Sequence, residues 1–362
     1  MVEPLGFVLL RRIKRTGPMT VAEYMAEALH HQSGGYYADG DPFGAIGDFI
    51  TAPEISQMFG ELLGLWTLSA WVANGAPEPA CLVELGPGRG TLMADMVRAI
   101  GGVVDVSEVF EIHLVETNPS LRRIQADTLA PLNPVWHNDV SSLPEQPWLL
   151  VANEFLDALP MHQFRWTEGA WRECLVVSDA AGTGLAWGVE RSESPLAALL
   201  PAQTRENPID GAMAELSLAA NAIVTGIAHH VVRHGGAALI IDYGSERHGA
   251  GDSLQAVRHH QPVEALRDPG SVDLSSHVDF SQIREACRAG GADFAGPVEQ
   301  GRFLIDLGIE ERAGALSRGA TLGQRRDIES GLRRLIGSAE MGALFKVAGL
   351  LPPGTPDLAG FG

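Results

Sequence analysis

This 362-residue chain contains only three cysteines and two lysines. Cys81, Cys174 and Cys287 lie far apart and form no C-x-x-C pair, which argues against a disulfide framework and against a zinc ribbon. A reducing compartment is therefore expected. Apart from Lys14 and Lys346, every permanently cationic side chain is arginine, and alanine and glycine are abundant. This usage is typical of a GC-rich bacterial genome.

The chain also lacks an apolar run long enough to cross a membrane. The longest candidate, Leu216 to Val232, carries Ser217, Asn221 and Thr225 at every fourth position, which predicts a polar stripe along a core helix. Basic residues gather at positions 11–15, but acidic residues flank them on both sides, unlike an acid-poor mitochondrial presequence. We interpret this cluster as a solvated helix face and expect a bacterial cytoplasmic protein without a membrane span.

Negative charge dominates the composition. The chain has 45 acidic residues against 26 Lys and Arg, a formal net charge of -19. Such a field repels phosphate backbones, so we expect no nucleic-acid partner, whereas a cationic ligand or an arginine-bearing protein is favoured. Hydrophobic residues make up 45% of the chain, which excludes a disordered protein, and the length allows two or three domains.

Short apolar strands alternate with helices through the middle of the chain. We expect strands at 81–85, 112–115, 135–137, 148–152 and 237–241, a rhythm that predicts a parallel sheet with right-handed crossovers. Antiparallel strands at 163–177 and 185–189 interrupt it. Two long helices are expected, one from about Ala212 to His234 and one from Arg302 to Leu316.

These elements predict an α/β fold with a Rossmann-like sheet, an inserted antiparallel segment, and added N- and C-terminal helical regions. We divide the chain into an N-terminal helical region with a glycine-rich loop (1–77), the Rossmann-like core (78–160 and 212–362) and an inserted substrate-side segment (161–211). In the glycine-rich loop, Tyr36, Tyr37 and Asp48 either close over a ligand or belong to an ordinary surface loop.

The densest motif follows the first expected strand and reads Glu84-Leu-Gly86-Pro-Gly88-Arg-Gly90-Thr91. Glycines at 86 and 88 let the backbone turn tightly and approach a ligand that faces the next helix N-terminus. A plain strand-to-helix turn is the alternative, which three alternating glycines disfavour. A dinucleotide site requires its third glycine at position 91, where this chain has threonine. The E-x-G-x-G-x-G form instead resembles motif I of the class I S-adenosylmethionine-dependent methyltransferases.

Two acids after the next strands fit the same interpretation. Glu116 ends the second strand, where a carboxylate accepts hydrogen bonds from both hydroxyls of a ribose. Asp139, just past the third strand, resembles the acid that contacts the adenine amino group in these enzymes. Each is by itself equally consistent with a turn carboxylate at a strand end, and their order after the glycines is what favours a cofactor site.

A second polar segment, Asn153-Glu154-Phe-Leu-Asp157, ends the fourth strand. Ligands of open α/β sheets bind at the carboxyl ends of the strands, so two carboxylates there favour capture of a cationic nucleophile. A guanidinium must be oriented and must lose a proton during transfer, and a carboxylate does both. A helix start capped by Asn153, with acids near the positive end of its dipole, is an equally good interpretation of this spacing.

Taken together, six segments make the chain resemble the MidA-like family, that of the mitochondrial complex I assembly-factor arginine methyltransferase and its bacterial relatives. The segments are Thr51-Ala-Pro-Glu54, Val83 to Gly90, Asn153 to Pro160, Ile241 to Gly244, His277 to Phe280 and Met341 to Lys346. The resemblance implies a Rossmann-like methyltransferase that moves a methyl group from S-adenosylmethionine to an arginine of a protein, a respiratory complex I subunit or its bacterial equivalent. A homodimer is compatible with it.

The resemblance also implies roles for single residues. Those implied to bind the cofactor are Thr51, Glu84, Gly86, Gly88, Gly90, Glu116 and Asp139. Those implied to face the methyl group and carry catalysis are Asn153, Glu154 and Asp157. No metal is expected, because His229, His230 and His234, although at helical spacing, have no acid beside them.

Two other function classes stay open from the sequence. A nicotinamide-dependent oxidoreductase is disfavoured by the threonine at position 91. A non-catalytic assembly factor that keeps the fold and clamps a respiratory subunit is disfavoured by the intact set of glycines and acids.

Overall fold

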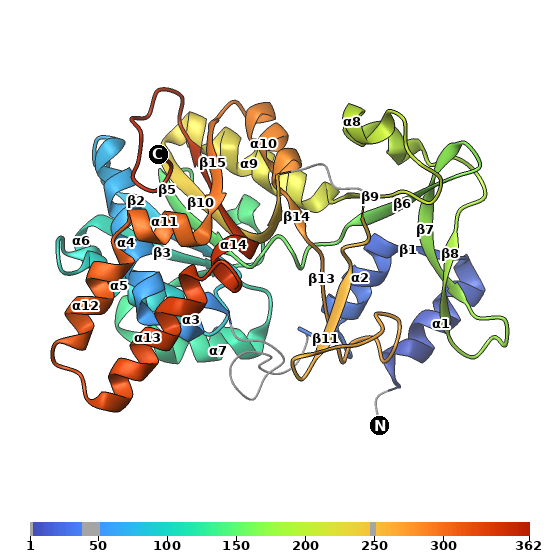
Figure 1. Cartoon of the computed structure of the whole chain (residues 1–362), viewed down its shortest axis with the longest axis horizontal. Helices are drawn as coiled ribbons and strands as arrows, with labels where there is room; N and C mark the ends of the chain where they lie inside the picture. Colours follow the sequence, from blue (N-terminus) through green and yellow to red (C-terminus); the bar gives the residue numbers. More distant parts are fainter. Residues whose placement is uncertain (1–2, 38–50, 247–250) are drawn as a thin grey trace.

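The computed structural model describes residues 3–37, 51–246 and 251–362. In Figure 1 the chain divides into a large α/β lobe on the left and a smaller lobe of helices and antiparallel strands on the right. Asp48 and most of the glycine-rich loop lie outside the described residues. Within these ranges no helix combines the length and the apolarity needed to span a bilayer.

The large lobe is built on an eight-stranded sheet in the order β15-β16-β10-β5-β2-β3-β4, with β14 added beside β10. Its strands are β2 (Ala80–Leu85), β3 (Phe110–Val115), β4 (Val135–His137), β5 (Trp148–Asn153), β10 (Gly236–Ser245), β14 (Val278–Asp279), β15 (Asp293–Glu299) and β16 (Phe345–Leu351). The five strands from β4 to β10 run parallel, and β16 is antiparallel to both of its neighbours. The expected parallel sheet is therefore confirmed.

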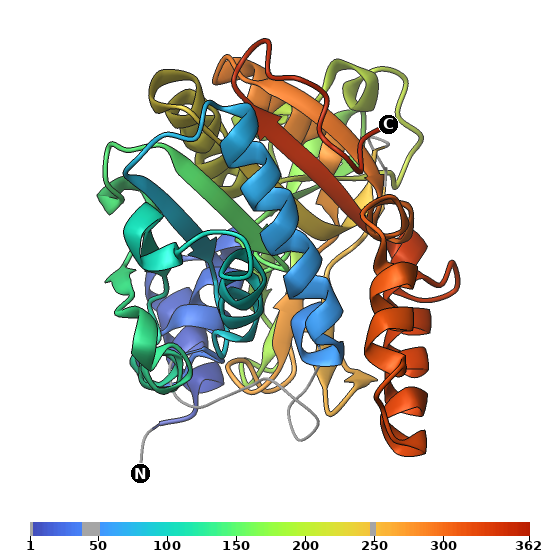
Figure 2. The same ribbon diagram turned by 90° about the vertical axis from the view of Figure 1, so that its left-hand side faces the viewer.

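Helices cover both faces of this sheet because alternate strand residues point to opposite sides. On one face the core forms against α4 (Gln57–Ala73), α5 (Thr91–Ile100), α11 (Gln300–Asp306), α12 (Ile309–Ser317) and α13 (Leu322–Ile336). On the other it forms against α9 (Leu218–His234) and α10 (Phe280–Ala289). Figure 2 shows α4 lying across the near face of the strands. The central strands are thus buried on both sides.

The smaller lobe combines the N-terminal helices with the strands of the expected inserted segment. Its sheet contains β1 (Met19–Thr20), β6 (His162–Thr167), β7 (Ala170–Ser178), β8 (Leu185–Val189) and β9 (Met213–Leu216). Helices α1 (Leu5–Thr16) and α2 (Val21–His30) pack on it, and a small sheet of β11 (Gln255–Arg258), β12 (Gln261–Pro262) and β13 (Asp273–Ser275) lies beside α2. A capping box of Thr20 and Glu23 begins α2.

Three expected boundaries were wrong. The helix from Ala212 begins only at Leu218, because Ala214 and Leu216 are buried in β9, which pairs with β6, and Ser217 caps the helix. The helix from Arg302 to Leu316 is broken between α11 and α12 at Gly308, whose φ of 88° cannot continue a right-handed helix. The stretch 163–177 is a hairpin rather than one strand, turned at residues 168–169.

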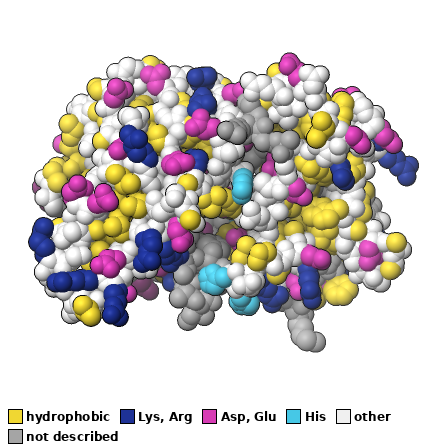
Figure 3. All heavy atoms as spheres, viewed as in Figure 1, with side chains coloured by type: hydrophobic (Ala, Val, Ile, Leu, Met, Phe, Trp, Pro, Cys, Tyr) yellow, Lys and Arg dark blue, Asp and Glu magenta, His cyan; other side chains and the backbone are white. Residues whose placement is uncertain are grey.

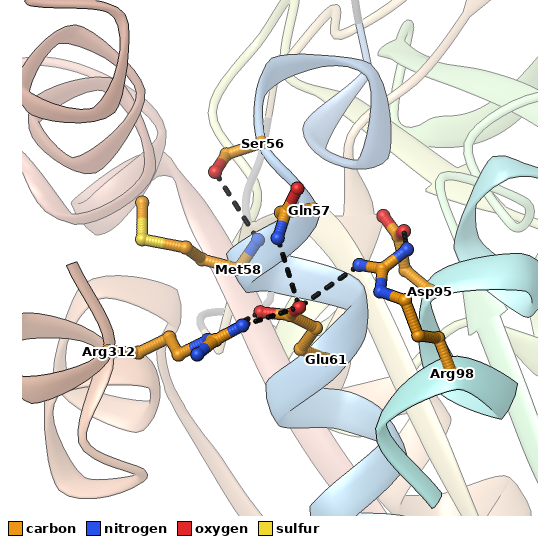
Figure 4. A network of polar contacts seen from close by, with 7 residues as sticks. All are labelled: Ser56, Gln57, Met58, Glu61, Asp95, Arg98 and Arg312. Atoms are coloured by element: carbon orange, nitrogen blue, oxygen red, sulfur yellow. Dashed lines mark hydrogen bonds and ion pairs between the residues drawn. The ribbon is translucent and has the colours of Figure 1, made fainter. Parts of the chain in front are cut away.

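A buried ion network attaches the C-terminal helices to this core (Figure 4). Glu61 of α4 is 5% exposed, and its carboxylate accepts hydrogen bonds from Arg312 of α12 at 2.7 and 2.9 Å and from Arg98 of α5 at 3.0 Å. Arg98 also donates to Asp95 at 2.6 Å. Arg325, Arg326 and Arg333 of α13 are exposed, and Figure 3 shows Lys and Arg side chains gathered at the lower left, where Figure 1 places α13.

Candidate active site

The glycine motif forms the turn between β2 and α5, at the carboxyl end of the sheet. Gly86, Gly88 and Gly90 have φ values of 62°, 53° and 83°, a left-handed region that side chains disfavour. A Cβ on Gly86 would lie 3.0 Å from Cδ2 of Phe155, so this close approach also needs a glycine. Gly90 is the N-cap residue immediately before α5, and a Cβ there would meet Leu129, away from the cavities.

Two cavities meet at this turn. The larger, of about 1280 Å³, is lined by Gly86, Gly88, Glu116 and Asp139, and the smaller, of about 210 Å³, includes Thr51, Glu84, Asn153 and Asp157 in its wall. Among the described residues, four line both cavities: Tyr37, Gly86, Gly88 and Glu154. A ligand in the larger cavity would therefore reach a ligand in the smaller one past the side chain of Glu154.

Glu116 is oriented by the helix that follows it. Asn118 caps α7 (Pro119–Thr128), and its backbone N–H donates to Oε1 of Glu116 at 2.7 Å. Gln125, two turns further along α7, donates to Oε2 at 3.2 Å. Burial raises the pKa of Glu116, and these donors counter that rise by stabilising the charged form. The geometry gives a fixed carboxylate at the wall of the larger cavity.

Asp139 and Thr51 are arranged differently from their neighbours in the predicted set. Asp139 is a solvent-facing acid at the rim of the larger cavity, and one of its oxygens accepts from the backbone N–H of Ser141 at 2.7 Å. Thr51 lines only the smaller cavity. Although the order of Thr51 and Glu54 suits a capping box, Thr51 makes no side-chain cap, and Glu54 instead accepts from the Thr91 hydroxyl at 2.6 Å.

Glu154 occupies a strained turn directly after β5. Its φ is 51°, a left-handed conformation that is unusual for a side chain of this kind and that recurs at functional sites. Its Oε1 accepts from the backbone N–H of Ala52 at 3.1 Å and from Nδ2 of Asn153 at 3.0 Å. Burial and the nearby charge of Asp157 outweigh these donors and raise the pKa of Glu154 to about 7. Such a carboxyl readily exchanges a proton at neutral pH.

Asp157 lies one turn further on and shares its surroundings with a third carboxyl. Burial raises its pKa to about 6, although the hydroxyl of Tyr243 donates to it. Its Oδ1 is buried without a hydrogen-bond partner among the described residues. Asp242, fully buried at the end of β10, accepts from the backbone N–H groups of Leu156 and Asp157 at 3.0 and 3.2 Å. Asp242 therefore fixes the turn that carries both catalytic candidates.

The smaller cavity contains acids that the sequence analysis did not assign. Asp273 of β13 lines it and accepts a hydrogen bond from the Tyr37 hydroxyl at 3.1 Å. Tyr37 was proposed to close over a ligand, and it does line both cavities. Glu84 is 3% exposed, its Oε2 has no partner in the described ranges, and burial raises its pKa to about 8. The smaller cavity is thus an acidic pocket, since five carboxyls and one arginine line it in the described part of the chain.

Comparisons with known proteins identify the family. A family model described as "Putative S-adenosyl-L-methionine-dependent methyltransferase" matches residues 62–298. The mitochondrial protein arginine methyltransferase NDUFAF7 of Mus musculus is 38% identical over 378 residues, which cover 97% of this chain and 85% of that protein. The homolog from Drosophila melanogaster is 37% identical over 374 residues, with 95% and 84% covered. The chain belongs to this methyltransferase family.

Solved structures agree with that membership. A crystal structure from Burkholderia thailandensis with bound S-adenosyl-homocysteine superposes with a TM-score of 0.85 at 29% identity, covering 98% of this chain and 93% of that one. A native structure of the same superfamily from that organism gives 0.83 at 28% identity. The methyltransferase therefore has the predicted Rossmann-like fold, its methyl donor is S-adenosylmethionine, and the nicotinamide alternative is left without support.

Proposed function

We propose that this methyltransferase transfers a methyl group to an arginine side chain of a protein. The observation that carries the proposal is the position of Glu154, which lines both cavities and has a pKa of about 7. The relatives from mouse and fly are named as protein arginine methyltransferases. The compact ammonium of lysine, by contrast, lacks the planar fork of N–H donors that two carboxyls match.

The larger cavity is suited to the methyl donor. Its glycine turn keeps side chains away from a bound cofactor at Gly86 and Gly88, and Glu116 presents a fixed carboxylate to which ribose hydroxyls can donate. Asp139 at the rim fits the adenine end. S-adenosylmethionine would supply an electrophilic methyl group on a positively charged sulfur.

The smaller cavity is suited to the guanidinium. Glu154 and Asp157 would each accept hydrogen bonds from its N–H groups, and the unpartnered Oδ1 of Asp157 would gain a donor. During transfer a nitrogen–carbon bond forms as the carbon–sulfur bond breaks, and the guanidinium proton passes to Glu154. The amide of Asn153, which donates to Glu154 at 3.0 Å, orients that carboxyl. Catalysis would rest mainly on positioning, with Glu154 as the base.

The partner and the compartment form a finer part of the proposal. We infer that the substrate is a subunit of respiratory complex I or its bacterial equivalent, in keeping with the resemblance of the whole chain. Three free, buried cysteines support a reducing compartment, for which we propose the bacterial cytoplasm. The net charge of -19 favours an arginine-bearing protein over nucleic acid. A homodimer stays a prediction that light scattering of the purified protein would test.

The test is methyl transfer to a defined acceptor. Purified enzyme is incubated with isotopically labelled S-adenosylmethionine and the peripheral-arm subunits of complex I from the same source, and products are sequenced by mass spectrometry. The proposal expects label on one arginine. Label on another residue type would contradict it. Cofactor binding without any transfer would instead favour the non-catalytic assembly factor.

A further inference from the structure

A group of potential metal ligands lies at the opposite end of the sheet from the active site. Cys81 of β2 and Glu111 of β3 are direct partners in the parallel register, and His113 lies two residues beyond Glu111 on the same face. The Cys81 sulfur, a Glu111 carboxylate oxygen and a His113 ring nitrogen all lie within 4.8 Å of one another. Four residues separate Cys81 from Gly86, so about 16 Å of strand separates this group from the methyl-transfer site.

Hydrogen bonds orient the two histidines of this group. The hydroxyl of Ser142 donates to the backbone carbonyl of Asp139 at 2.8 Å, so toward His137 Nδ1, at 3.0 Å, it can only accept. His137 therefore carries a proton on Nδ1, and its Nε2 lies 2.9 Å from Nδ1 of His113. One ring nitrogen of His113 is thus paired with His137, which leaves Nε2 for another partner.

Nε2 of His113 is a buried nitrogen. The side chain of His113 is only 4% exposed, and Nε2 has no hydrogen-bond partner among the described residues. Oε2 of Glu111 lies 3.5 Å away, beyond a normal hydrogen bond, and the Cys81 thiol is beside both groups. A cation shared by the three groups would give the buried nitrogen a partner.

We propose that Cys81, Glu111 and His113 bind one zinc ion. Sulfur, imidazole and carboxylate together are a ligand set typical of Zn²⁺, and water would complete a tetrahedron. Zinc bonds of about 2.0–2.3 Å place ligand atoms roughly 3.3–3.7 Å apart, which the 56% exposed Glu111 side chain can reach by rotation. His137 would be the outer hydrogen-bond partner that orients a ligating histidine.

Zinc coordination would also change the hydrogen bond between Cys81 and its polar neighbour Gln146. The Cys81 thiol donates to Oε1 of Gln146 at 3.3 Å. On binding, the thiol proton leaves to solvent, and a flip of the Gln146 amide presents its NH₂ to the thiolate. The ion would link β2 to β3 and, through His137, to β4. Its role is to hold the strands beneath the cofactor cavity and not to take part in methyl transfer.

The test is metal binding by tag-free, chelator-treated protein. Titration with Co²⁺ should produce a thiolate-to-cobalt charge-transfer band in the near ultraviolet that saturates at one ion per chain and disappears on addition of Zn²⁺. Cys81→Ala should abolish the band, whereas Cys287→Ala, which removes another buried free thiol, should keep it. A folded wild-type protein without the band, or a band that survives Cys81→Ala, would overturn the proposal.

A second variant guards against a failure to fold. Glu111 is exposed, so Glu111→Gln should leave the melting temperature of the metal-free protein unchanged. Calorimetric titration should show its zinc dissociation constant raised by about tenfold or more, and its thermal stabilisation by zinc reduced accordingly. Unchanged zinc affinity in this variant would remove Glu111 from the site and contradict the three-ligand proposal.

Discussion

Glu154 and Asp157 lie three residues apart on one turn, and the charge of Asp157 helps to raise the pKa of Glu154 to about 7. Both carboxyls lie in the wall of the smaller cavity, and of the two acids Glu154 also lines the larger cavity. A pair of acids that repel each other is held here by Asp242 and by backbone donors. Because the two carboxylates repel each other, a cation bound between them is favoured, and a guanidinium would supply that charge.

Replacing Glu154 by glutamine should abolish turnover while leaving cofactor affinity intact. The amide keeps the shape but accepts no proton, so kcat should fall by about 10²–10⁴. S-adenosyl-homocysteine binding, measured by calorimetry, should change little. Glu168→Gln is a matched control, because Glu168 has a similar φ of 52° and lies exposed on the β6–β7 turn. Full turnover in Glu154→Gln would remove it from the role of base.

The pH profile of kcat/KM should rise through about pH 7, where it is half-maximal, and level off above about pH 8. The free enzyme needs Glu154 deprotonated, and its pKa of about 7 sets this limb. Asp157→Asn removes a charge that raises the pKa of Glu154, so the residual activity should show its rising limb at lower pH. A limb that stays in place, or moves to higher pH, would show that Asp157 does not tune the base.

The contribution of Glu154 to the free energy of unfolding should fall as pH rises, whereas the activity rises with pH. The pKa of Glu154 is raised on folding from 4.5 to about 7, so the folded state binds the extra proton and the stabilisation is lost as pH rises through 7. Glu154→Gln should therefore gain up to about 3 kcal/mol in unfolding free energy at pH 8 and nothing at pH 4. Urea denaturation at both values measures this. A gain that is equal at both would attribute it to packing instead.

Gly86→Ala should weaken cofactor binding more than it weakens the fold. At a φ of 62° a Cβ costs about 1–2 kcal/mol of backbone strain, and it would press on Phe155 at 3.0 Å. We expect the dissociation constant of S-adenosyl-homocysteine to rise at least about tenfold, because the turn must shift. Gly75→Ala shares the strain at a φ of 84° with open space around it, and should lose stability alone. Equal affinities in the two variants would contradict the assigned turn.

Glu61→Gln should destabilise the fold without touching the site. The substitution leaves Arg98 and Arg312 facing a neutral amide, and we expect a loss of about 2–3 kcal/mol in urea denaturation. Glu3→Gln, which breaks the exposed pair with Arg11, should have no measurable effect. If Arg312→Ala alone costs as much as the double variant with Glu61→Gln, the two residues act as one unit. Simple additivity would argue against the network.

Local signals in the sequence were sufficient for the sheet, the glycine turn and several helix starts. The capping box of Thr20 and Glu23, and the caps Asn118 and Asp279, depend on neighbours within three residues. Local signals failed where a distant partner decided the outcome. Residues after Ala212 form a strand because β6 offers an edge to pair with. Glu54 accepts a hydrogen bond from the distant Thr91 hydroxyl and takes no part in a cap with Thr51.

The candidate site shows the same division. The sequence by itself determined which acids follow the strands, since the carboxyl ends of parallel strands must converge on one edge. Only the tertiary structure brought Tyr37 and Asp273 to that edge and placed the Ala52 N–H against Glu154, across 102 residues of chain. Their sequence neighbourhoods carry no such signal. The pKa of Glu154 was likewise decided by folding, because burial and the charge of Asp157 act through space and not along the chain.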